Sequence, residues 1–495
     1  MFSRLFGLGK QDKFIDSFKN RQHRVKAYKQ IRIDNSFNTL DDLYSARRIL
    51  TGNQQKTLLI VSTLFVISSF AFPFVTLFLS GLLFAIFYFS IVLFRAAILC
   101  NFDSAPNIKP FSLSNASAPT KKYSVLVALY KETGQVFDLV KSLQQLKWAP
   151  NKIEIFLLCE EIDLETINAI KQLNLPFFMR LVICPKGSPQ TKPRALNYAL
   201  QYCTGDYLVI YDAEDRPHPD QLLEAHFTFE NSSENYACLQ APLLIDNCNE
   251  TWLTKMFAIE YTTLFSGILI SLAKWGAPMP LGGTSNHFKT KILKMAGGWD
   301  AFNVTEDADL GIRLARLGYR CGVINSATYE EAPTTLAVWL PQRTRWLKGW
   351  IQTLLVHLRS PKQLFIDLGW RKFICFHLLI TGIVVSIMIH PIFIIVFPLQ
   401  VYSFFIDSPT LSYETFIIGI STFTLFAGYL TYGFLALAVT KGKPFTPNRL
   451  WILSIPIYWL LISLAGWRAI LQMFTAPHKW EKTEHGKSRR DTPKI

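Results

Sequence analysis

Apolar residues are distributed unevenly along the 495-residue chain, in long runs near both ends and in short runs between them. Almost every residue from 57 to 100 is apolar, and Arg95 is the only charged one. A helix needs about 20 residues to cross the hydrocarbon core of a bilayer. This run therefore predicts two transmembrane helices, at 57–75 and 78–99, with a turn near Phe72-Pro73.

The second long apolar region covers residues 366–474, and the number of passes in it is open. Residues 373–406 are mostly apolar but are interrupted at His390-Pro391, and two clear apolar runs follow. Three passes would place the basic end of the chain opposite the N-terminal segment. Four passes, with 373–406 folding as two short ones, keep both ends on one side. We favour a tail, residues 475–495, on the same side as the N-terminal segment.

Between these regions the pattern changes to short strands that alternate with helices. Runs of β-branched and aliphatic residues typical of buried strands occur at 123–129, 153–158, 181–183 and 207–211. Helical periodicity follows each of the first three. This alternation predicts an α/β domain with a doubly wound, mostly parallel sheet, whose ligands lie at the carboxyl ends of the strands. The domain is expected at 121–365, after a linker at 101–120 that is rich in Asn, Ser, Ala and Pro.

Two helices within this domain mix apolar, aromatic and charged residues, near 252–275 and 339–357. Helices of this composition lie in a membrane surface, with their Trp residues at the depth of the headgroups. A buried amphipathic helix of the α/β domain has a similar pattern. The sequence leaves both alternatives open, a helix in the membrane surface and a helix buried in the α/β domain. We favour the membrane surface.

Composition and charge agree with an integral membrane protein. Half of the residues are apolar and 14% are aromatic, which is uncommon in soluble proteins. The net charge of +15 is concentrated at the ends, and residues 1–56 contain 12 Lys or Arg against 5 Asp or Glu. A basic end beside an apolar span indicates the cytoplasmic face, so we expect an inner (plasma) membrane protein with its α/β domain in the cytoplasm. Neither a CxxC pair nor a nucleic-acid-binding module is found, so a zinc site and a nucleic-acid partner are not expected.

The segment 211–217 (YDAEDRP) places three carboxylates within four residues at the end of a predicted buried strand. Carboxylates this close repel one another and resist dehydration, so they belong either to a solvated turn or to a divalent cation. Asp212 and Glu214 are one residue apart and can face the same cation. Oxygen ligands suit Mg²⁺ or Mn²⁺, ions that usually bind substrate phosphates as well. Asp215 is an alternative ligand.

Three other segments add candidate chemistry, each with a plainer interpretation beside it. Segment 305–307 (TED) offers a carboxylate as general base, although a helix start with a Thr cap has the same pattern. Segment 342–346 (QRTRW) combines a guanidinium for a diphosphate with a flat ring for a sugar, or it is a basic interfacial helix. Segment 192–197 (KPRALN) can meet nucleotide phosphates, or it is an ordinary helix start.

Taken in order, these segments and 130–132 (YKE) resemble the motifs of family-2 membrane glycosyltransferases, the cellulose-synthase-like and curdlan-synthase-like processive β-glycan synthases. The resemblance covers residues from about 123 to 350, with apolar spans on both sides. It implies a GT-A-type catalytic domain inserted between transmembrane helices, and Mg²⁺ or Mn²⁺ as cofactor. In related synthases a loop near the membrane closes over the nucleotide, so the mixed-charge segment 479–486 is expected to contact the catalytic domain.

The resemblance also implies a role for each matching residue. Asp307 would be the catalytic base, and Asp212 and Glu214 would hold the metal ion. The residues that would bind the nucleotide sugar are Tyr130, Glu132, Glu160, Glu161, Lys192, Asp212 and Glu214. The residues that would bind the acceptor and the diphosphate are Thr284, Ser285, Thr305, Glu306, Gln342, Arg345 and Trp346. The sequence departs from the family pattern in having Glu as the second metal carboxylate and in lacking the Cys of the acceptor loop.

The implied function is inverting, metal-dependent transfer from a UDP-sugar, with UDP-glucose favoured, to a growing β-glycan that is translocated across the membrane. Its partners would be the donor, the glycan acceptor and the lipid bilayer, with accessory secretion subunits as further candidates. One alternative is transfer of a single sugar to a lipid carrier. Another is a non-enzymatic membrane receptor or transporter with a degenerate transferase domain, against which the presence of Asp212, Asp307 and Arg345 argues.

Overall fold

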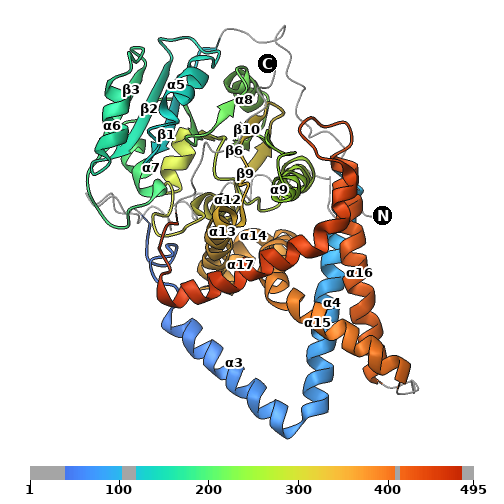
Figure 1. Ribbon diagram of the computed structural model, residues 1–495. Coiled ribbons are helices and arrows are strands. Elements are labelled where there is room, and N and C mark those ends of the chain that lie inside the picture. Colours follow the sequence, from blue (N-terminus) through green and yellow to red (C-terminus); the bar gives the residue numbers. More distant parts are fainter. Residues whose placement is uncertain (1–39, 103–118, 407–412, 482–495) are drawn as a thin grey trace.

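The computed structural model describes residues 40–102, 119–406 and 413–481. These residues form an α/β domain and a set of long helices that extend from one side of it (Figure 1). In Figure 1 the α/β domain lies at the top, and the long helices lie below it in blue, orange and red. Most of the predicted linker at 101–120 lies outside the described residues.

A seven-stranded sheet forms the centre of the α/β domain, in the order β3-β2-β1-β4-β8-β6-β9. Neighbouring strands are parallel except for β8, which is antiparallel to both β4 and β6. The strands are β1 (Tyr123–Leu129), β2 (Ile153–Glu160), β3 (Met179–Cys184), β4 (Tyr207–Tyr211), β6 (Tyr236–Gln240), β8 (Asn286–Lys289) and β9 (Arg320–Val323). The prediction of a mostly parallel α/β sheet is confirmed, and the four predicted strands are β1 to β4.

A second, three-stranded sheet has the order β5-β10-β7. Its strands are β5 (Arg216–Pro217), β10 (Thr328–Glu330) and β7 (Leu243–Ile245). Only the turn 212–215 separates β5 from β4 in the sequence. The small sheet therefore fixes the chain on the far side of that turn, at the carboxyl end of β4.

Helices cover both faces of the main sheet. Val125 and Val127 of β1 belong to one buried cluster and Leu126 to the other, as the two-residue period of a strand requires. Because strands buried on both faces are mostly apolar, β1 appears in the sequence as an apolar run with Ser124 as its one polar residue. The first cluster includes residues of α5 (Val136–Gln144), α6 (Leu164–Lys171) and α8 (Gln221–Glu230). The second includes residues of α7 (Lys192–Leu200), α11 (Thr290–Met295) and α12 (Glu306–Arg316).

The first two long helices, α3 (Gly52–Ala71) and α4 (Pro73–Leu99), meet at Phe72. Pro73 begins α4, because proline is tolerated at the first position of a helix but cannot donate the hydrogen bond that would continue the preceding one. The predicted turn at Phe72-Pro73 is confirmed. Phe94, near the end of α4, packs against Trp275 at a ring-centroid distance of 5.9 Å, so this end of the helix adjoins the α/β domain.

The helices of the second apolar region decide how the stretch 373–406 folds. The stretch 373–406 is continuous through His390-Pro391 and does not fold as two short helices. The elements are α14 (Pro361–Phe376), the π-helical turn η4 (His377–Thr381), α15 (Gly382–Ile406), α16 (Tyr413–Val439), the 3₁₀ turn η5 (Arg449–Ser454) and α17 (Ile455–Thr475). In Figure 1, α15 and α16 extend away from the α/β domain, whereas α17 runs across its base. The number of passes and the side of the tail stay predictions.

Five helices of the described chain are long and apolar enough to cross a membrane, namely Pro73–Leu99, Trp252–Trp275, Pro361–Ile395, Gly419–Val439 and Arg449–Thr475. They indicate a membrane protein. The helix α3, which contains most of the predicted span 57–75, is not among the five. The segment Trp252–Trp275 consists of α9 (Trp252–Thr263), the π-helical turn η3 (Leu264–Ile268) and α10 (Leu269–Trp275), and it is mostly buried within the protein. The other helix with an interfacial pattern is α13 (Leu336–His357), which packs against α17. The interfacial position of both stays a prediction.

Candidate active site

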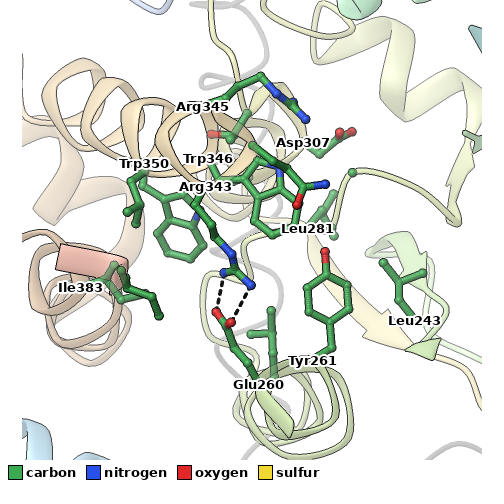
Figure 2. Close-up of a pocket in the computed structure, with 18 of the residues that line it drawn as sticks. Leu243, Glu260, Tyr261, Leu281, Asp307, Arg343, Arg345, Trp346, Trp350 and Ile383 are labelled. Atoms are coloured by element: carbon green, nitrogen blue, oxygen red, sulfur yellow. Dashed lines mark hydrogen bonds and ion pairs between the residues drawn. The ribbon is translucent and has the colours of Figure 1, made fainter. Parts of the chain in front are cut away.

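A cavity of about 670 Å³ lies at the carboxyl ends of the strands and continues between the long helices. Figure 2 shows side chains that line it, from α9, α13, the start of α12 and the loop before β8. All but two of the predicted site residues line this one cavity: Tyr130, Glu132, Glu160, Lys192, Asp212, Glu214, Thr284, Thr305, Glu306, Asp307, Gln342, Arg345 and Trp346. Residues up to 216 positions apart in the sequence are thus brought together.

The three carboxylates of the turn after β4 lie in two environments, two in the cavity and one buried within the turn. Asp212 and Glu214 line the cavity, and the Nζ atom of Lys192 forms an ion pair with Asp212. Asp215 is only 1% exposed. Its carboxylate accepts hydrogen bonds from the backbone N–H of Asp212, at 2.7 Å, and from the hydroxyl of Thr284. Burial, followed by repulsion from Asp212 and Glu214, raises the pKa of Asp215 well above its usual value. Asp215 therefore shapes the turn rather than facing the cavity.

Asp307 stands in the first turn of α12, facing the cavity. Its Oδ1 atom accepts a hydrogen bond from the indole Nε1 of Trp299 at 3.0 Å, which fixes the carboxylate. Burial and repulsion from Glu306 raise the pKa of Asp307 well above its usual value, and Lys192 opposes them. A raised pKa makes a carboxylate a stronger base. Thr305 stands at the cap position of α12, as its sequence pattern predicted, but its side chain makes no capping hydrogen bond.

Gln342, Arg345 and Trp346 lie three and four residues apart on α13, so they face the cavity from one side of the helix. The Oε1 atom of Gln342 and the Nε atom of Arg345 are buried without a hydrogen-bond partner among the described residues. Buried polar groups are normally paired. Two such atoms beside an acidic cavity indicate a polar ligand that supplies an acceptor for the guanidinium and a donor for the amide.

The end of β2 and the loop after β1 form another wall. Glu160 ion-pairs with Arg194 of α7 at 3.1 Å, and burial raises the pKa of Glu160 although Arg194 lowers it. Glu132 is also buried, at 8% exposure. Its backbone N–H donates a hydrogen bond of 3.1 Å to the hydroxyl of Thr166. Tyr130 follows the last residue of β1, lines the same cavity and is partly exposed.

The two remaining predicted residues do not reach the cavity. Glu161 is exposed and accepts a hydrogen bond of 3.2 Å from the backbone N–H of Lys186. Ser285 is fully buried, and its hydroxyl hydrogen-bonds to that of Thr328 at 2.6 Å. Glu161 follows the last residue of β2 and Ser285 follows Thr284, so each stands one position beyond a residue that does face the cavity.

An ion pair that the sequence reasoning missed stands beside Trp346. Arg343 of α13 binds Glu260 of α9 through two N–H···O contacts of 2.6 Å each, drawn as dashed lines in Figure 2. The hydroxyl of Tyr458 on α17 donates to Glu260 at 2.7 Å. The guanidinium of Arg343 lies 4.7 Å from the ring centroid of Trp346. The only signal in the sequence is a glutamate within a long apolar segment, Trp252–Trp275.

The segment after α17 returns to the site. Trp480 lines the cavity, and the guanidinium of Arg345 stacks on its ring at 4.4 Å. Lys348 of α13 donates a hydrogen bond of 2.9 Å to the carbonyl of Lys479. The expected contact between 479–486 and the catalytic domain is thus confirmed for Lys479 and Trp480, whereas 482–486 lies outside the described residues.

The chemistry of the cavity suits a divalent cation. Asp212 and Glu214 offer oxygen ligands, and Glu306, Asp307 and Glu330 add negative charge around them. Burial raises the pKa of each of these last three. Neighbouring carboxylates also raise it, and Lys192 lowers it. Within the described residues, no group of three or more His, Cys, Asp or Glu is arranged to hold a metal ion. Mg²⁺ and Mn²⁺ commonly take one or two carboxylates from a protein and their other ligands from substrate phosphates and water, and the pair Asp212 and Glu214 fits this requirement.

Comparison with known proteins adds a family match. Residues 207–471, more than half of the chain, match the family described as Glycosyl transferase family group 2. The Probable glycosyltransferase YdaM of Bacillus subtilis is 26% identical over 385 residues, which cover 73% of this chain and 86% of that protein. A Beta-monoglucosyldiacylglycerol synthase of Nostoc sp. is 26% identical over 238 residues, 47% of this chain and 49% of its own length. The Poly-beta-1,6-N-acetyl-D-glucosamine synthase of Staphylococcus aureus is 27% identical over 237 residues, 46% of this chain and 55% of its own.

A solved structure shares the architecture. The mannosyltransferase PcManGT from Pyrobaculum calidifontis, in complex with GDP-Man and Mn²⁺, aligns with a TM-score of 0.51 and 15% identity. The alignment covers 79% of this chain and 96% of that chain. At this identity the likeness concerns the fold alone, and it confirms the predicted GT-A-type domain.

Proposed function

Because the chain belongs to glycosyl transferase family group 2, it is a glycosyltransferase, and we propose that it transfers sugars from a UDP-sugar to a growing β-glycan with inversion at the anomeric carbon. The favoured donor is UDP-glucose, and the favoured mode is processive, with translocation of the product across the inner membrane. Because the family consists of glycosyltransferases, the alternative of a non-enzymatic membrane receptor or transporter is not supported.

One observation carries this proposal. Residues of the long helices, among them Tyr88 and Trp459, line the same cavity as Asp212, Asp307 and Arg345. A cavity of this shape gives an acceptor chain a path away from the reacting atoms and toward the membrane. The aromatic side chains Trp346 and Tyr261 stand beside that path, and flat rings are suited to sugar rings.

In the proposed reaction Asp307 is the general base. The acceptor hydroxyl attacks the anomeric carbon of the donor as its proton passes to the Asp307 carboxylate. The new carbon–oxygen bond forms while the bond from that carbon to the diphosphate oxygen breaks, so the configuration inverts. The hydrogen bond from Trp299 orients the carboxylate, and its raised pKa keeps it basic enough to accept the proton.

Cationic groups around the cavity would hold the departing diphosphate. Lys192 and Arg345 face the acidic turn, and a guanidinium can bind two phosphate oxygens at once. A Mg²⁺ or Mn²⁺ ion held by Asp212 and Glu214 would supply Lewis-acid stabilisation of the same diphosphate. Trp480 stacks on Arg345, so it would limit the access of water to this region.

A second candidate is transfer of one sugar to a lipid acceptor. The membrane end of the cavity has aliphatic walls, which include Ile91, Leu264 and Ile387, and such walls suit a hydrocarbon chain. The name of one relative, a beta-monoglucosyldiacylglycerol synthase, describes a lipid product. Product length separates the two candidates.

The test is synthesis by purified protein in lipid nanodiscs, supplied with radiolabelled UDP-glucose and Mg²⁺ or Mn²⁺. Insoluble labelled polymer would support the processive proposal, whereas label in the organic phase with one sugar per lipid would support the second candidate. Parallel reactions with other UDP-sugars and with GDP-mannose identify the donor. Product from GDP-mannose alone would contradict the proposed UDP-sugar, and absence of product with every donor would contradict the proposed function.

A further inference from the structure

Arg95 is the only charged residue of the first apolar region, and its side chain lines the membrane end of the cavity. Its guanidinium lies 5.5 Å from the ring centroid of Tyr432 and 5.1 Å from that of Trp459. Its Nη1 atom donates a long hydrogen bond, 3.3 Å, to the backbone carbonyl of Gly428. Two aromatic rings and one carbonyl are thus its contacts on α16 and α17.

A carboxylate partner is missing among the described residues, where no Asp or Glu forms an ion pair with Arg95. Ionisable residues within membrane helices are costly, and they normally face a cavity and pair with an opposite charge or mark a binding site. The side chain of Arg95 remains partly exposed. A guanidinium with free N–H groups in a cavity fits an anion that binds there.

Arg95 lies near the end of its helix, at the depth where lipid headgroups would lie in a membrane. It lies four residues before Leu99, the last residue of α4, which is about 6 Å along the helix. This is the end of α4 that adjoins the α/β domain through Phe94 and Trp275. Basic pockets between transmembrane helices at this level bind the phosphates of lipid headgroups.

The walls near Arg95 indicate what the anion is attached to. Ile91 lies one helical turn from Arg95 on the same face of α4, and Leu425 lies one turn from Gly428 on α16. Both line the cavity, as do Ile383 and Ile462. Aliphatic walls suit an acyl or prenyl chain. Tyr88 and Trp459, which line the path proposed above for a glycan, belong to the same end of the cavity, so a lipid and a glycan would compete for it.

We propose that Arg95 binds the phosphate group of a membrane lipid, whose hydrocarbon chain lies along the aliphatic walls of the cavity. The shared chemistry is a phosphate monoester or diester on a hydrocarbon anchor, and its source is either a bilayer phospholipid or a lipid phosphate that serves as acceptor. The meaning of the site for catalysis rests on the proposed function, but binding itself does not require turnover.

The test measures lipid binding without any sugar donor. Purified full-length protein in detergent is titrated with phosphatidylglycerol, with phosphatidylcholine of the same chains, or with dodecyl phosphate, and bound lipid is counted by native mass spectrometry. We expect wild type to bind phosphatidylglycerol and dodecyl phosphate in preference to phosphatidylcholine. Arg95→Gln should weaken the binding of both anionic lipids about tenfold, the loss expected for one charge-assisted contact, and Arg95→Lys should weaken it less.

Arg449→Gln is the matched control, because Arg449 is exposed at the start of η5 and lies outside the cavity. Its lipid binding should equal that of wild type. Preference for dodecyl phosphate over phosphatidylglycerol points to a lipid phosphate as the source, and the reverse preference points to a phospholipid.

Three results would overturn the proposal. The first is a wild type without preference for anionic lipid, which decides the matter even if Arg95→Gln does not fold. The second is equal lipid affinity in wild type and a folded Arg95→Gln. The third is displacement of the lipid by inorganic phosphate, UDP or an acidic oligosaccharide, which would assign Arg95 to a soluble ligand. A failure of sugar transfer alone would affect the proposed function and leave this binding result intact.

Discussion

Glu260→Gln tests the ion pair between Glu260 and Arg343, which lies against Trp346 in the wall of the cavity. Glu260 makes two contacts of 2.6 Å with Arg343 and accepts a third hydrogen bond, at 2.7 Å, from Tyr458. The side chain of Arg343 is 6% exposed and that of Glu260 is 26% exposed. Removing one partner of a buried pair costs about 3–5 kcal/mol. Because Glu260 is partly exposed, we expect a loss of about 2–3 kcal/mol in the free energy of unfolding.

The same change should also affect the acceptor. Arg343 lies 4.7 Å from the ring centroid of Trp346 and also donates a hydrogen bond of 2.9 Å to the hydroxyl of Tyr458. Loss of the Glu260 charge therefore removes the strongest of the contacts that hold the guanidinium against the ring. We expect KM for the acceptor to rise while KM for the donor stays within a factor of about two, since Lys192 and Arg345 are untouched.

The assay is unfolding in mixed detergent micelles, followed by tryptophan fluorescence, together with initial rates. A double-mutant cycle with Arg343→Gln isolates the pair, for which we expect a coupling of about 1–3 kcal/mol. Glu250→Gln is the control, because Glu250 is exposed just before α9, and it should change stability by no more than about 0.5 kcal/mol. Equal stability of Glu260→Gln and Glu250→Gln, or a coupling near zero, would refute the reasoning.

Three further predictions concern the site. Burial and Glu306 raise the pKa of Asp307 and Lys192 lowers it, so Glu306→Gln should move the acid limb of the pH profile of kcat/KM to lower pH. Lys192→Met should move that limb to higher pH, and shifts in the same direction would contradict the assignment. Chelation with EDTA should abolish transfer until Mg²⁺ or Mn²⁺ is restored, and Asp212→Asn should raise the metal concentration required about tenfold; unaltered activity in EDTA would exclude the metal. Trp480→Ala removes the stacking on Arg345, worth about 1–2 kcal/mol, and should raise KM for the donor about 5- to 30-fold; an unchanged KM would remove Trp480 from the donor site.

Three of the four strands that the sequence predicted are continuously buried, and the fourth, β3, is an edge strand with exposed residues. Strands β1, β2 and β4 are buried on both faces and are mostly apolar, with Ser124, Glu154 and Glu160 as the polar exceptions. Their short length and β-branched residues distinguish them from helices. β8 was not predicted, because its sequence, Asn-His-Phe-Lys, has neither an apolar run nor an alternating pattern. It is inserted antiparallel between β4 and β6, a pairing that only the tertiary structure determines.

In the site, too, residues with a local sequence signal could be predicted and contacts set by tertiary packing could not. Asp212 and Asp307 could be predicted because each stands at a recognisable position, the end of an apolar strand or the start of an amphipathic helix. The pairing of Glu260 with Arg343 joins residues 83 positions apart, and the stacking of Trp480 on Arg345 brings the tail segment to α13. Contacts of this kind depend on how helices pack, which local periodicity does not encode.

The central claim is that Asp307 removes the proton from the acceptor in a transfer from a UDP-sugar. The most direct measurement compares UDP release and labelled product for wild type, Asp307→Asn and Glu161→Gln, the last being the same chemical change in an exposed acid outside the cavity. The account predicts that Asp307→Asn lowers kcat by about 10²- to 10⁴-fold, with UDP affinity within a few-fold of wild type, and that Glu161→Gln behaves as wild type. Transfer by Asp307→Asn at a rate near that of wild type would contradict it.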